Sequence, residues 1–162
     1  ILKIRRYSYD LISFSKLENK LHEMKRKVNA IWKGDGIDGT GVLSSQSGAF
    51  NNMPYSFKTR FKNDDGKLGT NPEELIAAAL VGCFNMKLSF VLNEANFNPD
   101  QLDTEAILNF EDGKVISIDL DLKGKVPKLR EDKFIEFAND AKNNCPISGV
   151  LNCKISVNAN LN

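Results

Sequence analysis

The sequence predicts an α+β fold in which antiparallel sheets surround one long, buried central helix. Three observations predict it. Segments of alternating apolar and polar residues lie before and after the helical segments, the first helix carries strong start signals, and its residues 75–84 have no polar side chain. Strands, then helices, then strands along the chain are typical of α+β folds. With 162 residues, the chain is long enough for one hydrophobic core and too short for two.

Residues 1–23 differ in character from the rest of the chain. They carry Arg5, Arg6 and several serines, and polar residues interrupt their apolar positions. A signal peptide needs a continuous apolar segment, so this class of leader is disfavoured. We interpret 1–23 as an N-terminal extension that is partly helical, with an organelle-targeting leader as the alternative. Residues 24–162 form the predicted domain.

Three short strands are predicted in the first part of the domain. Apolar and polar residues alternate over 28–33, and a second strand is expected around 41–45 after a loop rich in glycine and aspartate. Residues 54–61 alternate again and predict a third strand, with Arg60 on its polar face. The apolar face of that strand carries Tyr55, Phe57, Thr59 and Phe61.

The long central helix is predicted from Pro72 to Asn93. Asn71 is a favourable N-cap, Pro72 suits the first helical position, and Glu74 stands three residues after the cap as in a capping box. Residues 75–84 contain no polar side chain. A helix that is apolar all round must be covered on every side.

The remaining residues predict two strands, two helical segments and a last strand. Asp112-Gly113 is the hairpin turn between the two strands, and Cys145-Pro146 ends the first helix. In order, these elements are strands 103–110 and 114–124, a helix 130–143, a helical turn 146–151 and a strand 153–161.

The charge balance is nearly even, because 22 Lys and Arg stand against 21 Asp and Glu, for a net charge of +1. Such a chain has no strong field to recruit nucleic acid or an anionic membrane. No uninterrupted apolar run approaches the roughly 20 residues of a membrane-spanning helix. We therefore expect a soluble protein with neither nucleic acid nor a membrane as partner.

The candidates for chemistry are the three cysteines, Cys83, Cys145 and Cys153. They form no C-x-x-C pair, and the single histidine, His22, lies far from them, so no metal site is expected. Cys83 lies deep in the apolar helix, where burial raises a thiol pKa and a packing role is the simplest interpretation. Cys145 precedes a proline at the start of a short helix, whose amides would stabilise a thiolate. Cys153 fits a core role on the last strand.

Three segments together resemble the OsmC/Ohr family of thiol-dependent hydroperoxide peroxidases. They occur in the family's order, and the place of the arginine in the first resembles the OsmC branch. The resemblance covers residues 24–162 and implies the OsmC-like fold as an intertwined homodimer with active sites at its interface. The segments are PYSFKTRF, GTNPEELIAAALVGCFNMKLSFVL and AKNNCPISGVL.

The resemblance also implies roles for four residues. The peroxidatic thiolate attacks the outer peroxide oxygen, an alcohol leaves, and the sulfenic acid condenses with a second thiol to a disulfide. An external dithiol, of lipoyl type more than thioredoxin, reduces that disulfide, and no cofactor is needed. The residues are Cys83 as peroxidatic cysteine, Cys145 as resolving cysteine, Arg60 as the cation that activates Cys83, and Glu73 as the carboxylate that holds Arg60. The adjacent Glu74, interpreted above as the capping-box residue, could exchange roles with Glu73.

Helix geometry adds one expectation to the resemblance. Glu73 and Cys83 are ten positions apart (83 − 73), which is about 15 Å along a straight helix. An arginine paired with Glu73 would need a helix bulge to reach the sulfur of its own chain, so we expect a composite site between two copies. An apolar pocket would favour organic hydroperoxides over hydrogen peroxide. Its expected walls are residues 75–84, Met86, Tyr55, Phe57 and Phe61.

Other functions stay open at this point. A redox sensor with a regulatory Cys83–Cys145 disulfide, or a carrier of a small apolar ligand, would use the same fold without turnover. General thiol-disulfide exchange is disfavoured by the missing C-x-x-C and the buried attacking sulfur. Thiols that must be kept reduced, together with the missing signal peptide, predict a cytoplasmic location.

Overall fold

Two three-stranded sheets contain all the strands of the described residues, 24–62 and 69–162, in this computed structural model. The first sheet has the order β1-β2-β3 and the second β4-β5-β6. The predicted extension at 1–23 lies outside the described residues. The strands are β1 Val28–Lys33, β2 Thr40–Ser45, β3 Met53–Ser56, β4 Gln101–Glu111, β5 Lys114–Lys125 and β6 Lys154–Leu161.

Strand pairing follows the prediction of antiparallel sheets with one exception. β1, β2 and β3 pair antiparallel, and so do β4 and β5, whereas β6 runs parallel to β5. A parallel neighbour requires a crossover, and helices α4 (Glu131–Asn144) and α5 (Pro146–Val150) supply it between β5 and β6. This crossover places Cys145, which ends α4, beside the central helix rather than at a sheet edge.

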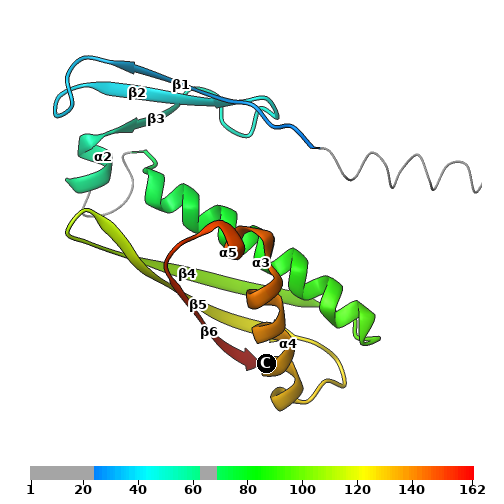
Figure 1. The fold of residues 1–162 in the computed structure, drawn as a ribbon. Coiled ribbons are helices and arrows are strands. Elements are labelled where there is room, and N and C mark those ends of the chain that lie inside the picture. Colours follow the sequence, from blue (N-terminus) through cyan, green and yellow to red (C-terminus); the bar gives the residue numbers. More distant parts are fainter. Residues whose placement is uncertain (1–23, 63–68) are drawn as a thin grey trace, which may run out of the picture.

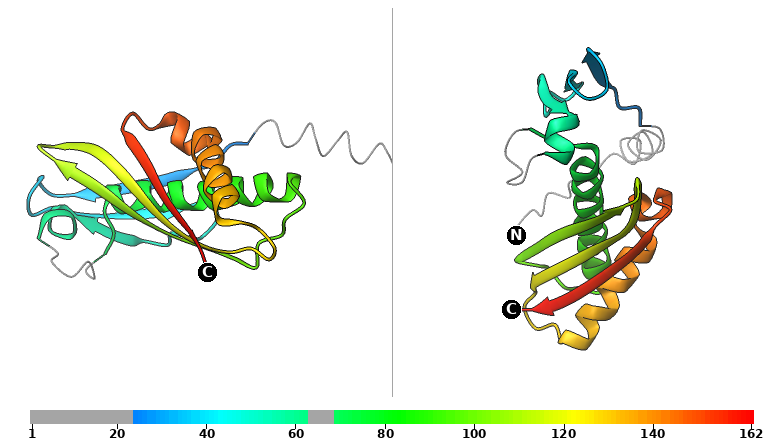
Figure 2. Two further views of the ribbon diagram at one scale, coloured as in Figure 1. Left: turned by 90° about the horizontal axis from the view of Figure 1, so that it is seen from below. Right: turned by 90° about the vertical axis from the view of Figure 1, so that its left-hand side faces the viewer.

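The central helix α3 (Pro72–Glu94) and α4 lie side by side on one face of the second sheet (Figures 1 and 2). The inward residues of β5 pack with both helices in one core. Burial of each large aliphatic or aromatic side chain contributes roughly 1.5–3 kcal/mol. The fully buried members of this core include Leu80, Phe84, Leu88, Ile118, Leu122 and Phe134.

The predicted third strand is wrong beyond Ser56. Residues 57–61 form a short helix, α2 (Phe57–Phe61). Ser56 and Thr59 close a capping box, in which the Thr59 amide donates to Ser56 Oγ at 3.1 Å and the Ser56 amide donates to Thr59 Oγ1 at 2.8 Å. The hydrogen bonds of the Ser56 and Thr59 amides favour a helical turn more than the aromatic alternation favours a strand. Arg60 therefore extends from a helical turn rather than from a strand face.

The start of α3 has the predicted chemistry with one difference. Asn71 is the N-cap, and its side chain accepts from the Glu74 amide at 2.8 Å, with Pro72 in the first turn. The Glu74 carboxylate accepts from the Thr70 hydroxyl at 2.9 Å. The Glu74 carboxylate thus bonds to a residue just before α3, which leaves the Glu73 carboxylate available for another partner.

The chain does not cover α3 on every side, contrary to the prediction. Its buried residues all belong to one side of the helix, while Met86 is 62% and Phe90 64% exposed. An exposed stripe follows the helical spacing of three and four residues. It consists of Ala79, Gly82, Met86 and Phe90, and we call it the open α3 stripe.

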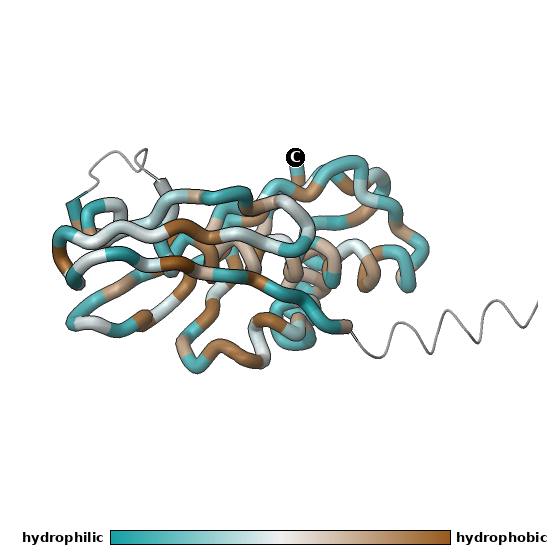
Figure 3. Tube along the Cα trace, turned by 90° about the horizontal axis from the view of Figure 1, so that it is seen from above, coloured by the Kyte–Doolittle hydropathy of each residue, from teal (hydrophilic) through white to brown (hydrophobic). Residues whose placement is uncertain are grey.

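The strand β1 is also uncovered. All six of its residues are exposed, including Val28, Ile31 and Trp32, so it has no buried face within the chain. Figure 3 looks down on this sheet and shows hydrophobic stretches in the middle of its strands.

Among the described helices, α3 is the one whose length and composition would let it cross a membrane. The expectation that no segment approaches this threshold is wrong, because Asn85, Lys87 and Ser89 are too few to break the apolar character of the helix. The core helix of a soluble protein passes the same test, so the finding is weak evidence for a membrane span.

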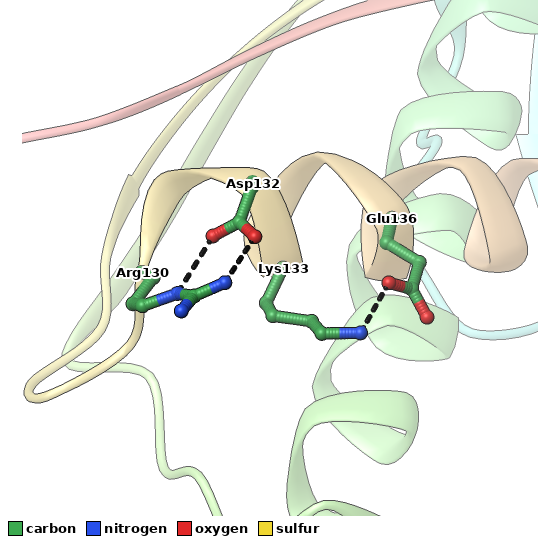
Figure 4. A network of polar contacts seen from close by, with 4 residues as sticks. All are labelled: Arg130, Asp132, Lys133 and Glu136. Carbon is green, nitrogen blue, oxygen red and sulfur yellow. Dashed lines mark hydrogen bonds and ion pairs between the residues drawn. The ribbon is translucent and has the colours of Figure 1, made fainter.

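The outer surface of α4 is polar and carries local ion pairs. Arg130, at the N-cap, pairs with Asp132, and Lys133 Nζ lies 2.6 Å from Glu136 Oε2 (Figure 4). All four side chains are exposed, and exposed pairs contribute little to stability. The opposite side of α4 is its buried side, where it meets α3 and α5.

Gly124 tests the close contact between β5 and α4. A Cβ at this position would lie 2.2 Å from Cζ of the fully buried Phe134. We expect Gly124→Ala to lower the free energy of unfolding by about 1–3 kcal/mol through overpacking, measured by urea denaturation. Gly36→Ala is the control, since no atom lies within 4 Å of its Cβ position. Equal stability of the two variants would contradict the described packing.

Candidate functional site

Arg60 and Glu73 form a forked ion pair at the start of α3. Arg60 Nε donates to Glu73 Oε2 at 3.0 Å, and the second guanidinium nitrogen donates to Oε1. The arginine comes from α2 and the glutamate from the first turn of α3, so the turn made by Ser56 and Thr59 decides where the guanidinium lies. A two-point pair fixes the plane of the guanidinium as well as its position.

Two aromatic rings hold the Arg60 guanidinium from its sides. Its central carbon lies 4.8 Å from the centroid of the Phe61 ring and 5.1 Å from that of Phe110. Cation–π contacts of this kind restrain a guanidinium without neutralising it. Phe110 and Leu108, both from β4, line a cavity of about 180 Å³ with Arg60 and Glu73.

The sequence predicted only part of the lining of this cavity at Arg60. Phe61 lines the cavity as expected. Tyr55 instead packs against Trp32 in the first sheet, with ring centroids 5.5 Å apart, and Met86 is exposed. Phe110 and Leu108 were missed, because no local signal in β4 indicates which part of the chain its end will meet.

The second cluster consists of the thiols of Cys83 and Cys145. Cys83 lies on α3, half-buried, and Cys145 lies between α4 and α5, 2% exposed. Both side chains pack in the same hydrophobic core, close enough for each thiol to shift the pKa of the other. Residues 62 positions apart (145 − 83) are thus brought together by the crossover.

The two thiols differ in acidity within the chain. Burial raises the pKa of Cys83, and donation to Cys145 raises it further. Burial also opposes ionisation of Cys145, but the hydrogen bond from Cys83 and those from the amides of Ser148 and Ile147 and the Ser148 hydroxyl outweigh it, and the net pKa is lowered. Within a single chain, Cys145 is therefore the more acidic of the two thiols.

The ion pair and the thiol pair are separate within one chain. Helix α3 is continuous from Pro72 to Glu94, so no bulge shortens the rise of about 15 Å between Glu73 and Cys83. Arg60 is not among the groups that shift the pKa of either thiol. Cys153, the third cysteine, is half-buried and packs against the core.

Metal ligands do not cluster in the part of the chain that the structure describes. No group of three or more His, Cys, Asp or Glu residues there could hold a metal ion. His22 lies outside the described residues. The reactive groups that the structure brings together are the two thiols, with the Arg60 guanidinium fixed at a distance from them.

The sequence matches the family model described as OsmC-like protein over residues 63–160. It is also 40% identical over 140 residues to peroxiredoxin OsmC of Escherichia coli, a match that covers 84% of this chain and 96% of that protein. The chain belongs to the OsmC-like family. The match to the family model contains Glu73, Cys83 and Cys145, and Arg60 lies three residues before it (63 − 60).

Further OsmC-like relatives extend the comparison. An organic hydroperoxide resistance protein-like sequence of Staphylococcus aureus is 28% identical over 105 residues, covering 60% of this chain and 72% of that protein. The crystal structure of the organic hydroperoxide resistance protein OhrB of Bacillus subtilis superposes with a TM-score of 0.60 at 27% identity, covering 86% of this chain and 98% of that one. An OsmC-like protein of Mycoplasma pneumoniae, at 17% identity and a TM-score of 0.67, covering 86% and 98%, supports the fold. The named relatives support a peroxidase-type role in the family.

Proposed function

We propose that this OsmC-like protein is a thiol peroxidase that reduces organic hydroperoxides with Cys83 and Cys145. The observation that carries the proposal is the proximity of the two thiols, which come from different elements, pack in the same hydrophobic core and shift each other's pKa in opposite directions. A ligand carrier has no need of two thiols in contact. The peroxidase and hydroperoxide resistance relatives support the same chemistry.

The proposed cycle balances with thiol chemistry alone. The Cys83 thiolate attacks the outer oxygen of ROOH, the O–O bond breaks, and the alkoxide takes a proton and leaves as an alcohol. Cys83 is now a sulfenic acid. The Cys145 sulfur attacks it, water leaves, and a Cys83–Cys145 disulfide forms. A dithiol then gives two electrons to the disulfide, becomes oxidised itself and restores both thiols.

Arg60 has the proposed role of activating Cys83 across a homodimer. Burial and the bond to Cys145 raise the pKa of Cys83 in the single chain, so ionisation at neutral pH needs a nearby cation. Arg60 of the same chain is tied to Glu73 at the other end of the apolar run. Arg60 of a second copy would keep the pair with its own Glu73, but its distance from Cys83 of this chain would not be set by the length of one helix. The open α3 stripe supplies apolar surface that a second copy would bury.

The substrate class follows from what surrounds the guanidinium. Phe61, Phe110 and Leu108 line the cavity at Arg60, so a hydroperoxide with an apolar substituent gains contacts there that hydrogen peroxide cannot make. The guanidinium stays protonated and can donate to a peroxide oxygen. We propose a dithiol reductant, of the lipoyl type suggested by the family, and a cytoplasmic location in keeping with thiols that must be kept reduced.

The first test is peroxide consumption by the wild type and three cysteine variants, with dithiothreitol as reductant. We expect Cys83→Ser and Cys145→Ser to lose steady turnover of cumene hydroperoxide, since each removes one sulfur of the cycle. Cys153→Ser is the control and should keep the wild-type rate. Hydrogen peroxide should be the poorer substrate. One equivalent of hydroperoxide should remove two of the three free thiols, and mass mapping should locate the new disulfide at Cys83 and Cys145.

Two outcomes of that experiment would reject the peroxidase. A wild type that forms the disulfide once but shows no turnover with any dithiol would favour a redox sensor. A Cys83→Ser variant as active as the wild type would make Cys83 a packing residue.

The neighbouring glutamates provide a matched pair of variants. Glu73→Gln removes the charge that holds Arg60, whereas Glu74→Gln changes a contact with Thr70 only. Loss of a positioned charge should lower kcat/KM for cumene hydroperoxide about tenfold or more in Glu73→Gln, with Glu74→Gln close to wild type. Equal losses in the two variants would mean that both act through the stability of α3, which melting temperatures would reveal.

A further inference from the structure

Helix α2 depends on its neighbours for its position. It has five residues, Phe57–Phe61, and so short a helix is not stable by itself in water. Its ion pair with the loop between β1 and β2, in which Lys58 Nζ lies 3.5 Å from Asp38 Oδ1, is exposed on both sides, and such pairs contribute little. Buried contacts must therefore set the position of α2 and of its Arg60.

The Thr59 hydroxyl makes such a buried contact. Thr59 is the buried residue of α2 and is 7% exposed. Its Oγ1 accepts from the Ser56 amide at 2.8 Å, and its hydrogen is shared between the carbonyl oxygens of Ser56 and Thr70, each at 2.9 Å. The bonds to Ser56 are local to the cap of α2, whereas Thr70 lies eleven positions further along the chain (70 − 59). The hydroxyl thus links α2 to the residue directly before the N-cap of α3.

Thr70 is itself held in place by β3 and by α3. Its amide donates to the Pro54 carbonyl oxygen at 3.2 Å, and its hydroxyl donates to the Glu74 carboxylate at 2.9 Å. The preceding residue, Gly69, has a φ of +134°, and a Cβ there would lie 2.7 Å from the Pro54 oxygen and 3.2 Å from Thr59 Cγ2. The chain therefore passes closely between β3 and α2, and the acceptor of the Thr59 hydroxyl has a fixed position.

Two links thus join neighbouring residues of α2 to the start of α3. Thr59 reaches the backbone of Thr70, and Arg60 reaches the side chain of Glu73. The Arg60 side chain is 34% exposed, and an ion pair that solvent reaches restrains a helix less than a buried bond from a short side chain to the backbone. The Thr59 link therefore fixes where the Arg60 backbone lies, and the fork with Glu73 fixes the plane of the guanidinium.

We propose that Thr59 is a positioning residue, whose hydroxyl fastens α2 to Thr70 and so presents the Arg60 guanidinium to Glu73 and to the hydroperoxide. The role rests on the peroxidase function proposed above. Without this hydroxyl, the Thr70 carbonyl loses a donor, α2 can shift, and the guanidinium no longer meets the Glu73 carboxylate in one plane. A shift of about 1 Å in a group that acts on the reacting atoms costs up to about a hundredfold in rate.

The first test follows the Arg60 guanidinium by NMR and uses no peroxide. Thr59→Val keeps the shape of the side chain without its hydroxyl, and Thr59→Ser keeps the hydroxyl. Exchange of the Arg60 Nε hydrogen with water, assigned by its absence in Arg60→Lys, should be slow in the wild type and in Thr59→Ser, and several-fold faster in Thr59→Val. Arg130, whose Nε donates to Asp132 on α4 at 2.9 Å, is the internal control and should not change.

Equal exchange in the three proteins would overturn the proposal, whether or not the protein is a peroxidase. Thr59→Ala, which removes the hydroxyl with a smaller side chain, repeats the measurement and should give the same result as Thr59→Val. Melting temperatures of all variants show which of them are folded.

The second test measures kcat/KM for cumene hydroperoxide. Thr59→Val should lose about tenfold or more, and Thr59→Ser should stay close to the wild type. Ser56→Ala removes the cap bond to the Thr59 amide but leaves the Thr59 hydroxyl in place, so it should lose less. An equal loss in Ser56→Ala would assign the effect to the cap of α2 and reject the link to Thr70. A wild type without turnover would reject the peroxidase function, and the NMR result would still decide the link.

The third test separates the positioning of Arg60 from a general loss of stability. If Thr59 acts through the Arg60–Glu73 pair, Thr59→Val should lower kcat/KM much less in the Glu73→Gln background than in the wild type, because residues that act as a unit are not additive. Thr104→Val is the matched control, since its hydroxyl donates to Asn85 at 2.6 Å and ties β4 to α3 without involving Arg60. Its effect should be the same in both backgrounds. The same fold loss for Thr59→Val in both backgrounds would contradict the proposal.

Discussion

The Arg60–Glu73 ion pair is attached to the first turn of α3, and the rest of the site depends on this attachment. Glu73 lies in the first turn of a 23-residue helix that runs unbroken past Cys83, so the two backbone positions are about 15 Å apart along the helix axis. Phe61 and Phe110 restrain the guanidinium on two sides. A charge held this firmly acts only on a group that is brought to it, and in the proposed homodimer the open α3 stripe would be the surface that brings a second copy there.

The thiols of Cys83 and Cys145 differ from each other in acidity and in exposure. Within the chain, burial and its hydrogen bond raise the pKa of Cys83, while Cys145 has a lowered pKa through the groups of α5. The more exposed sulfur is therefore the weaker acid until a cation approaches it. This division suits the proposed cycle, in which Cys83 meets the oxidant and Cys145 is the buried internal partner.

Local signals in the sequence predicted most of the fold, and non-local contacts account for what they missed. Asn71 and Pro72 fix the start of α3, and alternation over β4 and β5 predicts the hairpin, because these patterns act within a few residues. The strand expected through Phe61 was wrong because the Ser56–Thr59 capping box competes with alternation, a signal readable in the sequence. Pairing of Arg60 with Glu73 followed from the family resemblance, whereas Phe110 reaches Arg60 through tertiary structure, which no local pattern encodes. The uncovered side of α3 could not be predicted from an apolar run that says nothing about which chain covers it.

The most direct test of the composite site is complementation between two inactive variants. Arg60→Met and Cys83→Ser chains, each with its own affinity tag, are co-expressed, and the mixed dimer is isolated through both tags. If Arg60 of one copy serves Cys83 of the other, one of the two sites is intact, and the mixed dimer should consume cumene hydroperoxide at about half the wild-type rate per dimer, a statistical expectation for independent sites. If each site draws both residues from one chain, both sites are defective, and a mixed dimer as inactive as its parents would contradict the account.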